Sequence, residues 1–271
     1  MRRPSPIFWF LLALIAGVAL FPYAWIVLTS FKARHDILTT PPVWVHDPSW
    51  LNYTNMLFFR GFDRYLLNSI IIGLGSTALS LLVGTLAAYA FSKYKVPAGN
   101  HLFFYILATR LGPPVAYALP MYFLFSNLGL LNTHLGVIVA HATFNLVLVV
   151  WMMKTFFDEI PEEVEEAARL DGCSEGQLFR KISLPLAPPG LVTAAIFVFI
   201  FSWNELLFAM ILSAGDTNTL PAMIPSLVLH TGTLWGEVAA AAVVQTIPVI
   251  IFTFIAQRHL IRGLSFGAVK G

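Results

Sequence analysis

The sequence predicts an all-α polytopic membrane protein with six transmembrane helices, and three observations support that prediction. Hydrophobic residues make up 58% of the 271 residues and charged residues only 11%, whereas about a quarter of a soluble domain is charged. Several apolar runs are long enough to cross about 30 Å of hydrocarbon, which takes roughly 20 helical residues. The runs are also long and continuous, which favours helices over a membrane barrel.

The expected spans form a single domain over residues 1–271. They lie near residues 7–28, 68–91, 102–126, 135–154, 187–213 and 238–257.

The first two spans carry distinct local signals. Pro22-Tyr23-Ala24-Trp25 offers no small-x-small cleavage site, so the first run is expected to be an uncleaved anchor. Residues 29–65 then form the longest outside segment, expected to lie as an interfacial cap. The second run repeats small residues every four positions, and such a stripe allows close approach of helices within the chain or across a subunit boundary. Its members are Ser76, Ser80, Gly84 and Ala88.

The third span contains a charge and a break. Arg110 lies well inside it, where a charged side chain costs roughly 2.5 to 3.5 kcal/mol on insertion scales, so it is expected to face protein or water. Gly112-Pro113-Pro114 follows and is expected to open the helix. One interpretation is passage of a solute here. The other is that Arg110 snorkels or pairs with Glu205.

The fourth and fifth spans hold further polar side chains. His141 and Asn145 share one helical face, and such a pair more often bridges helices than binds cargo. Trp203-Asn204-Glu205 would suit a polyhydroxyl ligand through stacking and hydrogen bonds. Equally, Glu205 is a gate or an interhelical partner. The residues predicted to line a substrate pathway are Arg110, Pro114, Asn145, Trp203, Asn204 and Glu205.

A charged segment separates the fourth and fifth spans, and we call residues 158–185 the elbow. Pro161 suits a first helical position, and the glutamates after it place negative charge at the positive end of a helix. Gly172 ends this helix, and Ser174 with Gln177 forms a capping box that starts a second one. A proline at position 185 bars continuation. The sequence therefore predicts two short helices joined by a tight bend outside the bilayer.

The distribution of Lys and Arg predicts the orientation of the chain in the membrane. With a cytoplasmic amino terminus, only Lys32, Arg34, Arg60 and Arg64 lie outside, whereas every other Lys and Arg except Arg110 lies inside. The positive-inside rule therefore places both termini and the elbow in the cytoplasm. The single cysteine of the chain lies in the elbow, which fits a reducing compartment.

Motifs of catalysis are absent from the sequence. It has no Gly-x-x-x-x-Gly-Lys-Ser/Thr phosphate loop, no His-Glu-x-x-His pair and no Gly-x-Ser-x-Gly turn. We therefore predict no enzyme, no catalytic residue and no metal site. Any work that this chain performs takes its energy from another polypeptide.

The elbow resembles the loop by which ABC importer permeases dock on their ATPase subunits. The shared pattern is Glu-Ala-Ala, three residues, Gly, nine residues and Ile-x-Leu-Pro, and every fixed position is matched. The coupling residues that this resemblance implies are Glu166, Ala167, Ala168, Asp171, Gly172, Ile182, Leu184 and Pro185. Over nearly the whole chain, Trp203-Asn204-Glu205, Leu119-Pro120 and the closing residues 263–271 resemble the maltose-type carbohydrate permeases, in particular the smaller permease.

The resemblance implies a type I ABC importer permease in the bacterial inner membrane, importing a sugar, polyol or sugar derivative by alternating access. Its implied partners are a homologous second permease, a dimer of ABC ATPase subunits and a periplasmic or lipid-tethered solute-binding protein. ATP and Mg belong to the ATPase, and no cofactor is expected on this chain. The elbow is expected to seat in a cleft of the ATPase, and the carboxyl-terminal tail to reach between its subunits.

Two other functions stay open. The first is an ion-coupled secondary carrier of a small polar solute, in which Arg110 and Glu205 form part of a proton relay. The second is a membrane scaffold, which leaves the buried polar groups without purpose. Within the importer hypothesis, an Arg110 that faces the cavity favours an anionic sugar over a neutral one, and the sister permease is an alternative holder of the cargo.

Overall fold

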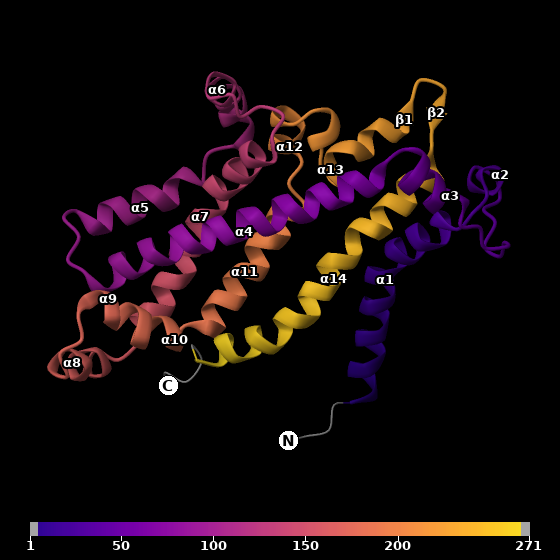
Figure 1. Cartoon of the computed structure of the whole chain (residues 1–271). Coiled ribbons are helices and arrows are strands. Elements are labelled where there is room, and N and C mark those ends of the chain that lie inside the picture. The colour runs from indigo at the N-terminus through magenta and orange to yellow at the C-terminus, as the bar shows by residue number, and fades with distance from the viewer. Residues whose placement is uncertain (1–4, 267–271) are drawn as a thin grey trace. The chain divides into compact units, whose positions relative to one another are not determined.

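Long apolar helices build most of the chain, as the sequence predicts. The computed structural model describes residues 5–266, and Figure 1 shows their ribbon. The chain divides into two compact units. Unit 1 takes the described residues up to Arg64 together with Met223–Pro248, and unit 2 takes Tyr65–Ala222 together with the described residues from Val249.

Unit 1 contains the first helix, a connection of short turns and the beginning of the last helix. In chain order its elements are α1 (Pro6–Ser30), α2 (Arg34–Ile37), α3 (Leu51–Thr54), the π-helical turn η1 (Asn55–Phe59), the 3₁₀ turn η4 (Ile224–Leu227), β1 (Val228–Leu229), β2 (Gly232–Thr233) and the first part of α14 (Trp235–Phe266). The two strands pair antiparallel, with Val228 opposite Thr233. This small hairpin was not predicted, because strands of two residues carry no periodicity to detect.

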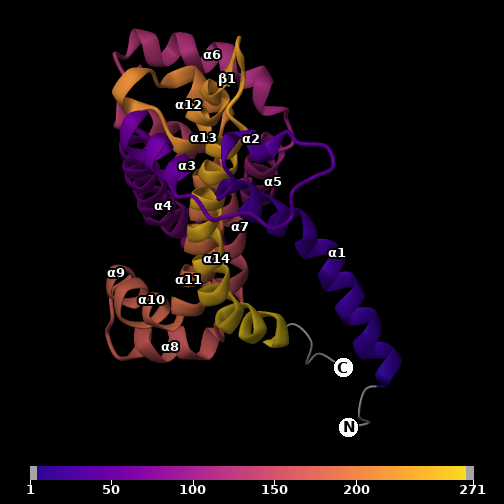
Figure 2. The ribbon, with the colours of Figure 1, turned by 90° about the vertical axis from the view of Figure 1, so that its right-hand side faces the viewer.

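Unit 2 contains the remaining helices. In chain order they are α4 (Phe62–Lys93, in unit 2 from Tyr65), α5 (Gly99–Thr109), α6 (Pro114–Asn127), α7 (His134–Asp158), α8 (Glu162–Leu170), α9 (Glu175–Leu178), the π-helical turn η2 (Phe179–Ser183), α10 (Leu184–Leu186), α11 (Pro188–Trp203), α12 (Leu207–Leu212), the 3₁₀ turn η3 (Gly215–Thr217) and α13 (Leu220–Met223). Both views place α6 and α8 at opposite ends of this unit (Figures 1 and 2).

The all-α polytopic fold class is confirmed. Four helices are long and apolar enough to cross a membrane, namely Pro6–Ser30, Phe62–Lys93, His134–Asp158 and Trp235–Ile255. Two bent pairs add to them: α5 with α6 at 94°, and the stretch from α9 to α10 with α11 at 75°. The described residues therefore give six crossings if each bent pair counts as one.

Two expected spans are broken. In the third, α5 ends at Thr109 and α6 begins at Pro114, so the expected opening at Gly112-Pro113-Pro114 is where the chain turns. In the fifth, α11 ends at Trp203 and α12 begins only at Leu207. No proline marks this second break, so no local pattern in the chain predicts it.

The small-residue stripe of α4 packs inside the chain. A methyl group on Gly84 would lie 2.7 Å from the Cγ1 atom of Val149 on α7, so the two helices approach as closely as a glycine permits. Ser76 donates to the hydroxyl of Ser202 on α11 at 2.8 Å, and the Ser80 hydroxyl lies 3.4 Å from the carbonyl oxygen of Ala142. The stripe therefore joins α4 to α7 and α11.

Candidate functional site

The elbow bends at Gly172, as the sequence predicts. Gly172 has φ +85°, a left-handed conformation that glycine adopts without a steric cost. Its N–H donates to the carbonyl of Arg169, and the N–H of Cys173 donates to that of Ala168, both at 3.0 Å. These two bonds form a Schellman motif that ends α8.

The start of the second helix also follows the prediction, whereas two prolines differ from it. Ser174 and Gln177 form a capping box, with the Ser174 N–H donating to the Gln177 side chain at 2.9 Å. Pro161 is the N-cap of α8 rather than its first residue. Pro185 lies inside α10, and the chain turns only at Ala187, before Pro188 begins α11. The π-helical turn that precedes α10 widens the backbone ahead of the proline.

The elbow is packed against the ends of the long helices. One apolar cluster joins residues of α4, α7 and α11 to the elbow side chains Ala168 and Leu178. Leu178 is fully buried, and Phe157 beside it is fully buried as well. Figures 1 and 2 both place α8 and α10 beside the lower ends of α7 and α11. Because closely packed interiors deform little, movement of the elbow should move these helix ends with it.

A buried ion pair fastens the elbow to α4. The Lys93 ammonium lies 3.3 Å from the Glu165 carboxylate, and their side chains are 8% and 3% exposed. The same ammonium donates to the carbonyl of Ile160 at 3.3 Å. The hydroxyl of Ser183, on the other leg of the elbow, donates to Glu165 at 3.1 Å. Glu165 therefore connects α4, α8 and η2, and the sequence pattern gave no sign of this because the three segments lie far apart in the chain.

The outer face of the elbow carries most of the predicted coupling residues. Exposed are Glu166, Ala167, Asp171, Gly172 and Pro185, and half-buried are Ile182 and Leu184.

Ala168 differs from the rest, because only 7% of it is exposed. It packs inside the elbow as part of the apolar cluster. Three apolar side chains that the sequence pattern missed lie on the surface instead: Val164, Leu170 and Leu186 are 41%, 89% and 55% exposed.

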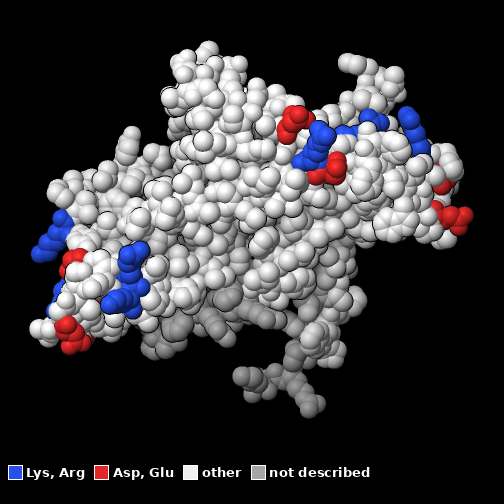
Figure 3. Space-filling model, viewed as in Figure 1, with Lys and Arg blue, Asp and Glu red and all other residues white. Residues whose placement is uncertain are grey.

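Arg169 and Glu175 form an ion pair on the elbow surface. In Figure 3, coloured side chains gather over the elbow and the turn after α4, whereas the middle of α4 is white. Arg169 donates to the Glu175 carboxylate at 3.0 Å, and Tyr94 donates to the same carboxylate at 3.2 Å. The hydrogen bond from Arg169 lowers the pKa of Glu175, opposed by weak desolvation. The pKa of Tyr94 is raised by burial and by this bond to Glu175.

A second candidate site is a cavity of about 230 Å³ within unit 2. Four predicted pathway residues line it, namely Arg110, Pro114, Asn145 and Glu205. The remaining lining is Gly112, His141, Phe144, Phe201 and Phe208. No sequence signal distinguishes the three phenylalanines, since aromatic residues are common in the spans of this chain.

Arg110 follows α5 directly and finds its partners on other helices. Its Nη1 atom donates to the carbonyl of Phe144 at 2.6 Å, and its guanidinium lies 5.1 Å from the centroid of the Phe201 ring. Among the described residues no carboxylate lies within ion-pair distance of it. The alternative pairing of Arg110 with Glu205 is therefore not present in this structure.

Glu205 instead joins a chain of polar groups at the break between α11 and α12. Its carboxylate accepts from the N–H groups of Phe208 and Ala209 at 3.0 to 3.1 Å, which starts α12. The Nε2 atom of His141 lies 3.0 Å from it. The other ring nitrogen of His141 lies 2.7 Å from the hydroxyl of Ser202. His141 thus bridges helices, as expected, and also lines the cavity.

Two predicted pathway residues lie elsewhere. Trp203 is 1% exposed, and its ring stacks on Phe199 with centroids 5.6 Å apart. Asn204 donates to the carbonyl of Ile200 at 2.8 Å. Neither is among the residues that line the cavity. In this structure the Trp203 indole stacks on Phe199 and does not line the cavity.

Comparison with known proteins gives one family for most of this chain. The model of the family described as binding-protein-dependent transport system inner membrane component matches residues 80–266. The match includes the elbow and every cavity residue. Part of the closing segment at 263–271, namely residues 267–271, lies outside the described residues.

Individual relatives extend the likeness over nearly the whole length. A probable ABC transporter permease protein, y4oR, of Sinorhizobium fredii is 38% identical over 264 residues, covering 97% of this chain and 94% of that protein. The trehalose transport system permease protein SugB of Mycobacterium tuberculosis is 39% identical over 267 residues, covering 95% of each.

A solved structure is similar too. It is the crystal structure of a bacterial ABC transporter involved in the import of the acidic polysaccharide alginate. One of its chains matches with a TM-score of 0.77 and 26% identity, covering 95% of this chain and 99% of that chain.

Proposed function

The chain belongs to the family of binding-protein-dependent transport system inner membrane components, and from that premise we propose that it is the smaller permease of an ATP-driven importer for a sugar-like solute. It is a permease subunit and not an enzyme, and ATP hydrolysis belongs to a separate subunit. The solute is a sugar, a polyol or a sugar derivative.

The elbow is the observation that carries this proposal. It presents the exposed part of a complete ATPase-docking pattern on two short helices that are anchored to α4, α7 and α11. A flexible loop would not transmit a movement of the ATPase to the spans, whereas an elbow packed against the long helices transmits it. We assign docking to the face that bears Glu166, Ala167 and Asp171, with Leu170 as its apolar anchor.

The assembly contains more than this chain. A homologous second permease, a dimer of ABC ATPase subunits that binds ATP and Mg, and a periplasmic or lipid-tethered solute-binding protein complete it. The chain lies in the bacterial inner membrane with the elbow and both termini in the cytoplasm. This orientation rests on the distribution of Lys and Arg.

The transport cycle follows from the anchorage. ATP closes the nucleotide-binding subunits, the elbow moves with them, and the ends of α4, α7 and α11 follow. Only contacts that differ between the inward-open and the outward-open states drive the exchange between them. The broken third and fifth spans lie beside the cavity, where irregular backbone is tolerated because it lines a space inside the protein.

The side chains that line the cavity suit a ligand that has both polar groups and an apolar face. Three phenylalanine rings offer faces for stacking, and Asn145, Glu205 and Arg110 offer hydrogen bonds. Relatives of the chain import different cargo: one is named for trehalose and one for the acidic polysaccharide alginate. Because no described carboxylate neutralises Arg110, we propose that the cargo carries an anionic group.

Copurification tests the importer class. The full-length chain, expressed with the genes beside its own, is extracted from membranes and reconstituted in proteoliposomes. An importer permease copurifies with nucleotide-binding subunits, and its uptake requires ATP. Uptake by the chain alone that a protonophore abolishes would establish the secondary carrier and remove the proposal.

Replacing Arg110 tests the cargo. The assembled importer with Arg110→Gln should lose roughly tenfold or more in uptake of an anionic sugar while a neutral analogue is little affected, because a hydrogen bond to a charged group contributes about 1.5 to 3 kcal/mol. Arg180→Gln, an exposed change on the elbow, is the matched control. If the Arg110 variant and its parent take up both analogues equally, the anionic cargo is excluded while the importer class stands.

A further inference from the structure

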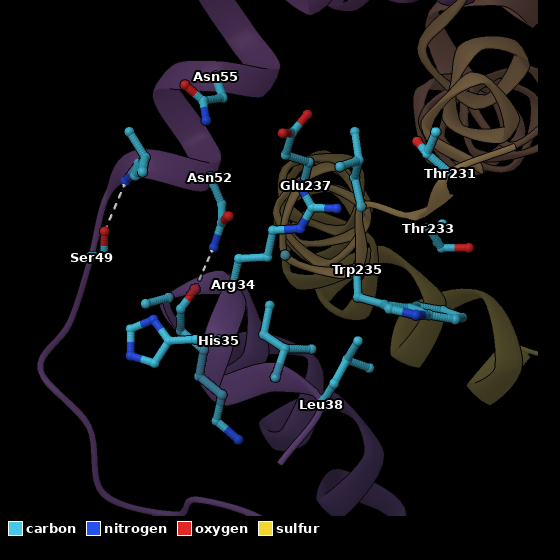
Figure 4. A pocket seen from close by; sticks show the side chains of 17 residues that line it. Arg34, His35, Leu38, Ser49, Asn52, Asn55, Thr231, Thr233, Trp235 and Glu237 are labelled. Atoms are coloured by element: carbon cyan, nitrogen blue, oxygen red, sulfur yellow. Dashed lines mark hydrogen bonds between the residues drawn. The ribbon is translucent and has the colours of Figure 1, made fainter. Parts of the chain in front are cut away.

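A larger pocket lies in unit 1, away from the residues used above. It measures about 630 Å³ and is shown in Figure 4. Its walls come from the connection that follows α1, from α3, and from the junction between β2 and α14. Arg34, Asn52 and Glu237 extend into the same space in Figure 4.

The pocket lies where two apolar helices end. Lys32 comes two residues after the last residue of α1, and Trp235 is the first residue of α14. Both helices are long and apolar enough to cross a membrane. Whichever way the chain is oriented, the lining residues therefore stand at the boundary of the hydrocarbon, which is where lipid phosphate groups lie.

Aromatic side chains mark the same boundary. Trp25 and Trp44 pack edge to face with ring centroids 4.9 Å apart, and Phe31 packs on Trp50 at the same distance. Trp235, which lines the pocket, is 51% exposed. Tryptophan is enriched at the level of lipid headgroups because its ring is apolar and its N–H is polar.

The positive charges of the pocket exceed the negative ones. Lys32 is 1% exposed, and its ammonium lies 4.2 Å from the centroid of the Trp25 ring. Among the described residues, neither Lys32 nor Arg34 has a carboxylate within ion-pair distance. The one carboxylate of the lining, Glu237, is paired with Arg60. A buried cation without an acidic partner is costly, so this site favours an anion from outside the chain.

The wall around these cations is closely built. The Asn52 amide donates to the carbonyls of Ser30 and Lys32 at 2.9 and 2.8 Å, which fixes the turn after α1. A methyl group on Gly236 would come within 2.4 Å of the Asn52 side-chain oxygen. The connection and the start of α14 therefore touch, and the pocket is a formed space rather than a gap between loose segments.

We propose that this pocket binds the headgroup of an anionic phospholipid. The phosphate accepts from Arg34, while Lys32, buried in the wall, adds positive charge without touching it, and the start of the acyl chains lies along the apolar lining residues Ile37 and Leu38. A headgroup is favoured over a soluble anion because the site stands at the hydrocarbon boundary beside an exposed tryptophan. The occupant would fasten the connection between α1 and α4 to the membrane surface.

Retention of lipid tests the proposal. The assembled importer is purified from nanodiscs that contain equal amounts of phosphatidylglycerol and phosphatidylcholine, and the retained lipid is counted by native mass spectrometry. The parent should retain phosphatidylglycerol preferentially. Arg34→Gln should lower that preference about fivefold, the size expected for removing one cation near a lipid surface. Arg180→Gln, which changes an exposed cation far from the pocket in the sequence, should leave it unchanged.

Buried Lys32 needs a separate variant, because removing it risks the fold. Lys32→Arg keeps the charge and should keep the preference, while Lys32→Gln in protein that remains assembled should reduce it. An unchanged preference in Arg34→Gln and Lys32→Gln overturns the proposal. Displacement of the retained lipid by millimolar inorganic phosphate assigns the site to a soluble anion and also overturns it. If these variants bind the solute-binding protein less well but retain the lipid, the pocket is a protein-docking site, and the proposal is overturned.

Discussion

At the scale of single residues, Gly172 controls the geometry of the elbow. Its φ of +85° suits glycine, and asparagine tolerates it better than other residues. A Cβ atom there would meet nothing within 4 Å, so any cost of a substitution comes from the backbone and not from crowding. This distinction allows a test in which side-chain volume and backbone strain are separated.

We predict that Gly172→Val uncouples transport while the protein stays inserted. The valine raises the energy of the bend by about 1 to 3 kcal/mol, which shifts the elbow toward another backbone path. Gly172→Asn should retain most of the activity because asparagine tolerates the left-handed region. The measurement is solute uptake together with ATP hydrolysis stimulated by the solute-binding protein.

Gly176 provides the matched control for this substitution. It is also exposed, lies in the elbow and has open space around its Cα, yet its backbone is helical. Gly176→Val should therefore leave uptake and stimulated hydrolysis nearly unchanged. Normal coupling in Gly172→Val would mean that the bend does not transmit the movement.

Glu175 yields a pH prediction. Its pKa lies below the ordinary value of 4.5, because Arg169 donates a hydrogen bond to its charged form. A carboxyl whose pKa is lower in the folded state than in the unfolded state stabilises the folded state at pH values above the unfolded-state pKa. This contribution to stability is lost as the pH falls through the folded-state pKa. The Arg169–Glu175 contact should thus persist at pH 4.5 and break only at lower pH.

Carbon NMR of the labelled Glu175 carboxyl measures this pKa directly. In Arg169→Gln the titration should move back toward 4.5, while Arg180→Gln should leave it in place. Because both partners are largely exposed, the effect on overall stability should be small. A Glu175 midpoint at or above 4.5 in the parent would show that the hydrogen bond is not formed in solution.

The sequence predicts local features of single residues better than distant ones. The bend at Gly172 and the capping box at Ser174 follow from residues a few positions apart, so they are visible in the chain order. The partner of Arg110 is the carbonyl of Phe144, 34 residues away, which no local pattern reveals. The burial of Trp203 against Phe199 is invisible in the sequence for the same reason, because the rotation of a helix depends on its packing.

At the scale of elements, one buried ion pair adds to the apolar contacts between α4 and the elbow. Lys93 and Glu165 are nearly inaccessible to solvent. Removing one partner of a buried pair leaves an uncompensated charge and typically costs about 3 to 5 kcal/mol, whereas replacing both by apolar residues is often nearly neutral. The pair therefore matters less for total stability than for holding α8 in one position against α4.

A double-mutant cycle tests this link. We predict that Lys93→Met and Glu165→Met each destabilise the protein by about 3 kcal/mol, and that the double variant loses much less than the sum. The double variant should nevertheless hold the ATPase less well, because Ser183 loses its acceptor on α8. Denaturant unfolding and ATPase copurification are the two measurements.

The exposed pair of Lys154 and Asp158 serves as the control cycle. Its atoms lie 2.6 Å apart at i and i+4 on α7, with side chains 25% and 44% exposed. A pair of this kind contributes less than about 1 kcal/mol. Equal coupling energies in the two cycles would contradict the proposed anchoring role of Lys93 and Glu165.

The sequence predicts the long helices well, but it predicts the breaks within the spans less well. Apolar length alone located α1, α4, α7 and α14, because hydrocarbon demands a long uninterrupted helix. The break before α6 was visible through Pro113 and Pro114. The break before α12 was not, since it depends on Glu205 accepting from the N–H groups of Phe208 and Ala209.

At the scale of the whole molecule, the fold explains why one chain holds both a docking surface and a cavity. The elbow and the cavity are both part of unit 2, and α7 and α11 run between them. His141 and Ser202 join those two helices beside the cavity, while Leu178 and Phe157 lie in the apolar cluster beside the elbow. A displacement of the elbow is thus carried along packed helices rather than through a flexible loop.

Orientation in the membrane is the premise of this mechanism, and cysteine labelling decides it. The chain has one cysteine, so Cys173→Ser gives a background without thiols. In that background, Gly176→Cys on the elbow should react with an impermeant maleimide only in inside-out vesicles. His230→Cys, exposed between β1 and β2, should react only in intact spheroplasts. The excess of Lys and Arg on the elbow side predicts this result. Labelling of Gly176→Cys in intact spheroplasts would place the elbow opposite any cytoplasmic ATPase, and the importer mechanism would then be wrong.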